Sequence, residues 1–339
     1  MIILTLISLA YGLTCPKYKC KPENLNFEKG TCVYYDNSTY FLETCGKDHY
    51  CPAISTPGNS TCTPKENPTQ KSWPGEPCES NSTCAFGYCQ NNTCIGKHWL
   101  QKCNITDECH VGLFCAEGIC WPQFKEDQEC TQDTDCLNNM KCWRLDSEPT
   151  GRCQRYFSFK KRYRIYDCQN YESDLCESGA CIAPGGNGKG RCIDKIKPNY
   201  LVSSCEENSD CPSKSGDWEF YGNCECGINS EGKRYCKPFL GSEEGTSYLE
   251  LLKLWYESPE VHKCQTVRRN SLTCKANWEH LDSYIYRELE FKHFPLIQGN
   301  DECVKEIYTQ KYWEAKQKVN TTDSHSLGLV PSLVLLLIS

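Results

Sequence analysis

The sequence predicts small disulfide-rich modules with short β-hairpins and little regular structure, followed by a small α-helical domain. Three observations lead to this fold class: 30 cysteines among 339 residues, a four-cysteine unit that recurs along the middle of the chain, and helical spacing of apolar residues from about residue 243. Cysteine at this density is typical of disulfide scaffolds made in an oxidising compartment. Zinc sites favour C-x2-C pairs and histidine, whereas the gaps here are mostly four, five and ten residues.

The repeating unit occupies residues 78–240. Each of the first three units holds four cysteines and can therefore close two bridges of its own, the fourth is looser, and Cys205 and Cys211 open a fifth. The cysteines of the first three units, all expected in disulfides, are Cys78, Cys84, Cys89 and Cys94; Cys103, Cys109, Cys115 and Cys120; and Cys130, Cys136, Cys142 and Cys153. Residues 96–102 and 121–129 are interpreted as spacers. Asn81, Asp133 and Asn208, three residues after a first cysteine, predict Asx turns.

Residues 13–77 form a separate N-terminal cysteine-rich segment with a predicted hairpin. Two β-prone runs, VYY and YFL, flank the turn residues 36–38, and residues 63–77 are interpreted as a linker. The segment has six cysteines, which allow 15 pairings, so a bridge between Cys32 and Cys45 across the hairpin is one candidate among several.

The C-terminal part, residues 241–320, predicts a three-helix domain. Apolar residues recur with helical spacing from Tyr248 to Trp255, from Trp278 to Leu289 and from Val304 to Ala315. The fifth unit has five cysteines and this domain has three, and both counts are odd. If all are oxidised, we expect at least one bridge to join the two regions.

Both ends of the chain are apolar. Residues 1–12 are expected to be a signal peptide rather than a buried strand or a membrane anchor, because the apolar run is too short to span a bilayer. Residues 321–339 resemble a GPI-attachment propeptide, with Asn320 as the expected attachment site and Ser324 as the alternative. A short tail anchor or a plain apolar terminus are the competing interpretations. The expected location is the extracellular face of the plasma membrane, with secretion as the alternative.

Sequons predict N-glycosylation in the N-terminal third of the chain. The five expected sites are Asn37, Asn59, Asn81, Asn91 and Asn104. Glycans there would enlarge what we expect to be the membrane-distal half. Asn, Ser and Thr are also ordinary turn residues, so each site has a purely structural interpretation as well. A sixth sequon, at Asn320, coincides with the expected lipid-attachment site.

A basic and aromatic stretch separates the third and fourth units. Residues 155–166, RYFSFKKRYRIY, are expected to form a solvated strand whose aromatic side chains cover a neighbouring module. Binding of a polyanion, or cleavage by a processing protease at Lys161–Arg162, are the functional alternatives. The formal net charge of −7 and the scattered basic residues argue against nucleic acid as a partner.

We find no catalytic, cofactor or metal motif. The sequence contains no G-x-S-x-G, H-E-x-x-H or P-loop pattern, and the seven histidines are scattered. Glu129, Asp133 and Asp135 are candidate calcium ligands, but they do not supply the six or more oxygens that calcium takes. We therefore expect no enzyme activity, no cofactor and no bound metal.

Some units resemble a known family. Cys-x-x-Asp-x-Asp-Cys at 130–136, Cys-x-x-Asn-x-Asp-Cys at 205–211 and Cys84-Ala-Phe-Gly-Tyr-Cys89 resemble the Dickkopf amino-terminal cysteine-rich domain and the repetitive GPI-anchored cysteine-rich surface proteins of single-celled eukaryotes. The resemblance covers about residues 78–236. It implies a disulfide module in an extracellular setting. The units here are tandem and no colipase-like second domain follows, so a Wnt-antagonist role is not implied.

Three functions remain from the sequence. The first is a non-enzymatic GPI-anchored ectodomain for coat, recognition or adhesion, held at the outer leaflet by lipid and binding a protein or glycan. The second is a secreted Dickkopf-like ligand or antagonist of a receptor. The third is a secreted hydrolase whose site would use a Glu or His of residues 243–320.

Overall fold

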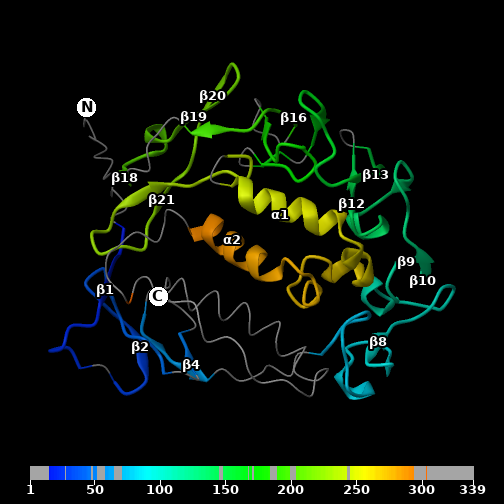
Figure 1. Ribbon diagram of the computed structural model, residues 1–339, viewed down its shortest axis with the longest axis horizontal. Coiled ribbons are helices and arrows are strands. Elements are labelled where there is room, and N and C mark those ends of the chain that lie inside the picture. Colours follow the sequence, from blue (N-terminus) through cyan, green and yellow to red (C-terminus); the bar gives the residue numbers. More distant parts are fainter. Residues whose placement is uncertain are drawn as a thin grey trace, which may run out of the picture.

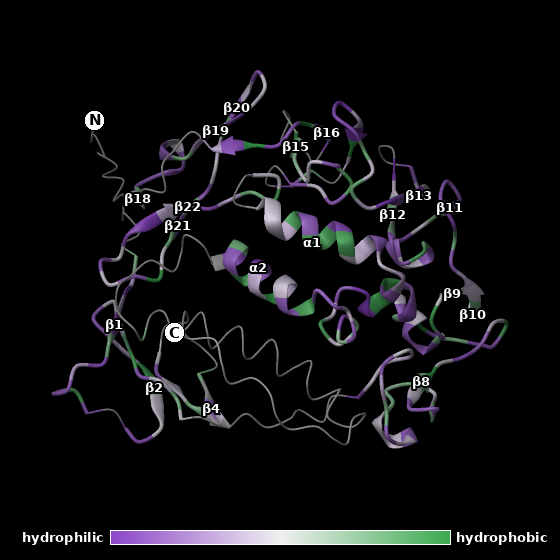
Figure 2. Ribbon diagram, viewed as in Figure 1, coloured by the Kyte–Doolittle hydropathy of each residue, from purple (hydrophilic) through white to green (hydrophobic). Residues whose placement is uncertain are grey.

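The computed structural model describes residues 15–26, 28–46, 49–51, 58–64, 71–144, 148–166, 168–169, 172–183, 189–198, 204–242, 245–293 and 303. In this part of the chain, small cysteine-rich units run in sequence order around two helices, α1 and α2 (Figure 1). Hydrophobic stretches recur along both helices, whereas hydrophilic residues dominate many of the surrounding loops (Figure 2).

Six units share one disulfide pattern, in which the first cysteine pairs with the third and the second with the fourth. The looser fourth unit follows it too, and so does the group Cys32, Cys45, Cys51 and Cys62. The twelve bridges are 32–51, 45–62, 78–89, 84–94, 103–115, 109–120, 130–142, 136–153, 168–181, 176–192, 205–224 and 211–236. The predicted disulfide module is confirmed. A Cys32–Cys45 bridge is wrong, because the interlocked pattern applies here as well.

The predicted N-terminal hairpin is confirmed. Strands β2 (Thr31–Asp36) and β3 (Thr39–Leu42) pair antiparallel, and Asn37 and Ser38 between them both have positive φ, as a type I′ turn requires. Strand β1 (Lys17–Cys20) lies parallel to β3 on one side, and β5 (Ser60–Thr61) pairs with β2 on the other. A separate pair is formed by β4 (His49–Tyr50) and β6 (Thr63–Pro64).

Short antiparallel strands build the five later units. The first two contain one hairpin each, the third and fourth a three-stranded sheet each, and the fifth two such sheets. The strands are β7 (Tyr88–Gln90) and β8 (Thr93–Ile95); β9 (Leu113–Ala116) and β10 (Ile119–Pro122); β11 (Glu129–Cys130), β12 (Met140–Trp143) and β13 (Gly151–Arg155); β14 (Arg164–Ile165), β15 (Cys181–Ile182) and β16 (Gly190–Cys192); and β17 (Lys197–Pro198), β18 (Ser204–Cys205), β19 (Pro212–Ser215), β20 (Trp218–Tyr221), β21 (Cys224–Cys226) and β22 (Arg234–Cys236).

A short 3₁₀ helix between the first and second cysteines is common to four units. These helices are η1 (Asn81–Thr83), η2 (Thr106–Glu108), η3 (Asp133–Asp135) and η4 (Asn208–Asp210). The first residue of each accepts a hydrogen bond from the backbone N–H of the third cysteine, at 2.8 to 3.2 Å. The predicted Asx turns are therefore wrong: these side chains bridge across the unit to the partner of the first cysteine.

The residues interpreted as spacers belong to the units. Ser72, Lys97, Phe124 and Phe159 each form a parallel bridge with the second cysteine of the unit that follows. Three residues after each bridge, the backbone φ angle is positive and falls in the left-handed region. The residues concerned are Gly75 (φ 92°), Leu100 (φ 67°), Asp127 (φ 65°) and Arg162 (φ 72°). A β-turn hydrogen bond closes around each of these positions. Each unit thus begins with a fixed turn ahead of its first cysteine.

Two of the three expected helices lie in the described residues. Helix α1 spans Thr246–Glu257 and α2 spans Leu281–His293, while residues 304–315 lie outside the described part of the chain. Trp255 and Ile285 are fully buried where the two helices pack together. Neither helix is long and apolar enough to cross a membrane.

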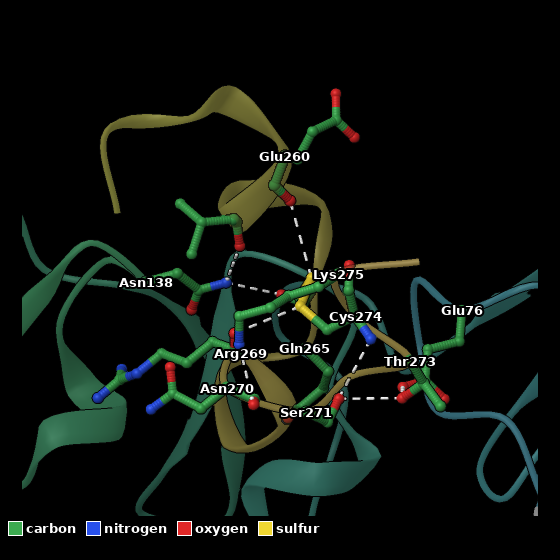
Figure 3. The surroundings of a disulfide bond; sticks show 12 residues. Glu76, Asn138, Glu260, Gln265, Arg269, Asn270, Ser271, Thr273, Cys274 and Lys275 are labelled. Atoms are coloured by element: carbon green, nitrogen blue, oxygen red, sulfur yellow. Dashed lines mark hydrogen bonds between the residues drawn. A yellow bond between two sulfur atoms is a disulfide. The ribbon is translucent and has the colours of Figure 1, made fainter. Parts of the chain in front are cut away.

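The segment between the helices connects the units to the helical domain. It contains the 3₁₀ helices η5 (Pro259–Lys263) and η6 (Thr266–Arg268) and is closed by the Cys264–Cys274 disulfide. The Asn138 side chain from the third unit donates to the carbonyl oxygens of Val261 (2.7 Å) and Cys264 (2.8 Å), as Figure 3 shows. All of these atoms are buried, so the bonds replace lost contacts with water.

Other units are held by the same segment. Thr273 Oγ1 donates to Glu76 Oε1 (2.5 Å) ahead of the first unit, and Gln265 Nε2 donates to the Thr106 carbonyl (2.8 Å) of the second. Arg269 donates to the Tyr156 hydroxyl at 2.7 Å, beyond the third unit. Segment 258–275 therefore fixes the positions of several units relative to the two helices.

Two long-range disulfides tie the N-terminal segment to the rest of the chain. Cys15 bonds to Cys226 in the fifth unit, and Cys20 bonds to Cys303 beyond α2. The bridge expected between the fifth unit and the helical domain is wrong, because the odd cysteine of each region pairs with this third segment instead. Both regions are thereby connected through β1.

The stretch 155–166 is not the expected solvated strand. Regular pairing covers only its ends, at Arg155 in β13 and Arg164–Ile165 in β14. Tyr156 and Phe157 are buried against the helical domain, where Tyr156 stacks on Tyr256 at 3.9 Å. The expectation that aromatic residues cover a neighbour is confirmed, but turns replace the strand between them.

We expect removal of the Cys15–Cys226 bridge to destabilise the oxidised protein more than removal of a bridge within a unit. The C15A/C226A variant opens a loop with a sequence separation of 211, whereas the control C78A/C89A opens one of 11. The chain-entropy model gives losses of about 5 and about 3 kcal/mol respectively. Denaturant unfolding measures both. Equal losses, or mapping of non-reduced peptides that joins Cys15 to another cysteine, would contradict the pairing.

Candidate binding cleft

A cleft of about 420 Å³ lies between the fourth and fifth units. Its lining includes Lys161, Arg162, Arg191, Asp194, Asp217 and Trp218, together with the backbone and small side chains around them. This volume is within the range of small-molecule sites. The cleft combines cationic, anionic and aromatic groups on two separately cross-linked modules.

The fourth unit supplies the cations through its opening turn. Tyr163 N–H donates to the Lys160 carbonyl (3.1 Å), and Arg162 N–H donates to the Cys192 carbonyl (2.8 Å). Phe159 is buried and stacks on Tyr163 at 3.9 Å. Aromatic packing therefore holds the turn on its unit, while Lys161 and Arg162 remain exposed.

The fifth unit supplies the aromatic wall. Strands β19 and β20 form a hairpin whose turn contains Gly216 (φ 59°) and Asp217, and Trp218 begins the second strand. Ser215 Oγ donates to the Asp194 carbonyl oxygen at 2.8 Å, which connects this hairpin to the fourth unit. Trp218 is 41% exposed, so its indole is open to a ligand.

The cations of the cleft are only partly neutralised. Lys161 pairs with Asp194, and both side chains are half exposed. Neither Arg162 nor Arg191 has an ion-pair partner within the described residues. Free guanidinium groups bind carboxylate, sulfate or phosphate oxygens through two parallel hydrogen bonds. The cleft is therefore suited to a ligand that carries an anionic group.

Cleavage at Lys161–Arg162 is disfavoured by the same geometry. The two residues lie inside a hydrogen-bonded turn, between the buried side chains of Phe159 and Ile165. Proteolytic nicking concentrates in loops whose backbone is exposed and free of such bonds. The basic stretch is thus better suited to binding than to processing.

Two of the residues considered for calcium, Asp133 and Asp135, accept backbone hydrogen bonds through one carboxylate oxygen each. Asp133 Oδ1 accepts from Cys142 N–H (3.0 Å), and Asp135 Oδ2 accepts from Thr131 N–H (2.8 Å) and Gln132 N–H (3.0 Å). These contacts shape the 3₁₀ turn of the third unit. The cysteines that approach one another within metal-ligand distance in the described units are the disulfide cores.

The five expected glycosylation sites are all exposed. Asn59 Oδ1 accepts from Tyr35 N–H (2.9 Å) and Asn81 Oδ1 from Cys89 N–H (2.8 Å), so the side-chain oxygen has a structural role at both sites. Glycans attach to the amide nitrogen, which these bonds leave free. Asn91 has a positive φ in the β7–β8 turn. Asn320, Ser324 and residues 1–12, the expected signal peptide, lie outside the described residues.

The helical domain contains a strongly perturbed lysine that no substrate can reach. Lys275 is fully buried, donates to the Asn270 carbonyl at 2.9 Å, and has its Nζ 4.9 Å from the Trp255 ring centroid and 4.8 Å from that of Tyr284. Burial lowers the pKa of Lys275 to about 7. The rings compensate part of the desolvation cost of the charged form.

Comparisons with protein-family models, curated proteins and solved structures give no match to this chain.

The cleft was only partly foreseeable from the sequence. The basic run that contains Lys161 and Arg162 was recognised, with polyanion binding as an alternative. Arg191 and Trp218 were missed, because they are isolated residues in other strands. Their only signal was the presence of a Trp in the hairpin-forming stretch of the fifth unit.

Replacement of Lys275 by methionine is expected to stabilise the protein near neutral pH. Because the folded-state pKa is about 7 and the ordinary value is 10.5, the unfolded chain binds more protons in this window. Stability should therefore rise from pH 7 toward pH 10, by up to about 1.4 kcal/mol per unit, and Lys275→Met should remove this slope. Thermal unfolding at pH 7 and 9 tests this against exposed Lys263→Met. Equal slopes in Lys275→Met and the unmodified protein would contradict it.

Proposed function

We propose that this protein is a non-enzymatic, GPI-anchored cell-surface ectodomain that acts in recognition or adhesion. Fifteen disulfides are typical of an extracellular protein. The cleft carries the proposal, since its exposed guanidinium groups and indole can hold a ligand. Cys192 in its wall is in a disulfide, and the Ser215 hydroxyl donates to a backbone carbonyl. The cleft thus offers no nucleophile activated by a neighbouring base.

The disulfides favour a cross-linked frame over a linear stalk. Cys303 bonds to Cys20, and residues 304–320 separate it from the expected lipid-attachment site at Asn320. With a lipid at that site, the N-terminal unit would lie near the membrane-proximal end of the chain. The glycans at Asn37 and Asn59 would then also be close to the anchored end, contrary to a membrane-distal position.

A secreted ligand or receptor antagonist is the alternative. It would use the same cleft and the same disulfide frame, and the Dickkopf resemblance of the units is compatible with it. The secreted hydrolase has less support, because the cleft lacks a nucleophile activated by a neighbouring base. The two binding functions differ in whether lipid holds the protein on the cell.

Treatment with phosphatidylinositol-specific phospholipase C tests the anchor. We expect cells that express the full chain to hold it at their surface and the enzyme to release it into the medium. An Asn320→Gln/Ser324→Gln variant, which removes both expected attachment residues, should lose surface retention. Complete recovery of the unmodified protein in the medium before treatment would overturn the anchored form and leave the secreted alternative.

A further inference from the structure

We infer that the cleft between the fourth and fifth units binds an acidic saccharide, through a sulfate or carboxylate group on its ring. The inference rests on the proposed extracellular recognition role and names the ligand class of that site. Lys161, Arg162, Arg191 and Trp218 are the residues that carry it.

The surroundings of the cleft are basic although the whole chain is acidic. Residues 155–198 contain nine Lys and Arg against five Asp and Glu, whereas the chain has a formal net charge of −7. One of the five acids, Glu172, is partly buried, and desolvation raises its pKa. Positive charge concentrated on one module attracts anions and raises their local concentration.

Two arginines lie directly opposite each other beside the cleft. Arg164 in β14 and Arg191 in β16 are Cα partners in the antiparallel register, so their side chains leave the sheet on the same face. Like charges in this arrangement destabilise a sheet. A bound anion would offset this repulsion, which explains how the pair can be tolerated.

Arg162 occupies a backbone conformation that disfavours its side chain. Its φ of 72° falls in the left-handed region, at the position where the first unit has Gly75, the second Leu100 and the third Asp127. Glycine adopts this region without strain and Asp tolerates it, whereas a long side chain does so at a cost. The turn therefore does not require arginine, since glycine, leucine and aspartate occupy the same position in other units.

The remaining groups of the cleft fit a sugar ring better than a simple anion. The exposed Trp218 indole offers an apolar face for the C–H surface of a pyranose. Asp217, which has no ion-pair partner among the described residues, can accept hydrogen bonds from hydroxyl groups.

The other strong surface candidate is an exposed apolar patch on the second unit. Trp99, Leu100 and Trp121 are exposed on the second unit, and the two indoles meet edge to face at 6.2 Å. Nothing in the structure identifies what would cover this patch. The cleft therefore carries the inference alone.

Calorimetric titration of the purified ectodomain with defined saccharides tests the inference. The probes are a sulfated disaccharide of uronic acid and glucosamine, its unsulfated form, and maltose as the neutral control. We expect binding of the sulfated form, of the unsulfated uronate, or of both, with affinity falling as salt increases. The first two arms distinguish sulfate from carboxylate as the recognised group. Equal binding of maltose would overturn the role of charge.

Variants separate a binding effect from a folding effect. Arg162→Gly removes the cation and relieves the left-handed strain, so we expect the melting temperature to hold or rise while affinity falls tenfold or more. R162Q/R191Q should abolish detectable binding. The control R144Q/R152Q removes the same charge from exposed positions outside the basic residues 155–198 and should change affinity less than threefold.

The outcomes also separate this inference from the proposed function. A protein that the phospholipase releases, but that binds none of the acidic saccharides, overturns the inference and leaves the anchored ectodomain intact. Binding that is lost in R162Q/R191Q by a protein found only in the medium supports the inference and overturns the anchor. Unchanged affinity in Arg162→Gly, or binding of a sulfotyrosine peptide with no saccharide binding, would also overturn the inference.

Discussion

Interlocked disulfides replace a large hydrophobic core as the main constraint on this chain. In six units the first cysteine bonds to the third and the second to the fourth, so each unit is cross-linked by two overlapping disulfide loops. In units that contain a 3₁₀ helix, the backbone N–H of the third cysteine donates a hydrogen bond to the side chain of the first helical residue. This hydrogen bond positions the helix against the strand that carries the third cysteine. Such units need little buried apolar surface, because cross-links restrict the unfolded chain.

The helical domain turns a row of units into one body. Segment 258–275 accepts or donates hydrogen bonds to residues before the first unit, inside the second and third, and beyond the third. Because these polar groups are buried, loss of one partner leaves another unsatisfied. Cys15–Cys226 and Cys20–Cys303 then attach the N-terminal unit to both the fifth unit and the C-terminal segment. These contacts and disulfides keep the units from moving independently of one another.

The binding that we propose at the cleft relies on this rigidity. Its cations come from the opening turn and strand β16 of the fourth unit, and its indole comes from a hairpin of the fifth. The hydrogen bond from Ser215 to the Asp194 carbonyl connects these two walls. A ligand that meets preorganised groups loses less affinity to ordering of the protein. The variation of the left-handed position, from Gly75 to Arg162, shows how one repeated turn can provide either a packing contact or a charged side chain.

The sequence by itself determined the local chemistry: even cysteine counts predicted bridges inside the units, β-prone runs around residues 36–38 predicted a hairpin, and apolar spacing predicted α1 and α2. These features depend on neighbours along the chain. The partners of Cys15, Cys20, Cys226 and Cys303 were decided only by the tertiary structure, because cysteine counting cannot distinguish pairings between distant segments. The same holds for the cleft, since Arg191 and Trp218 approach Arg162 only when separate units pack together.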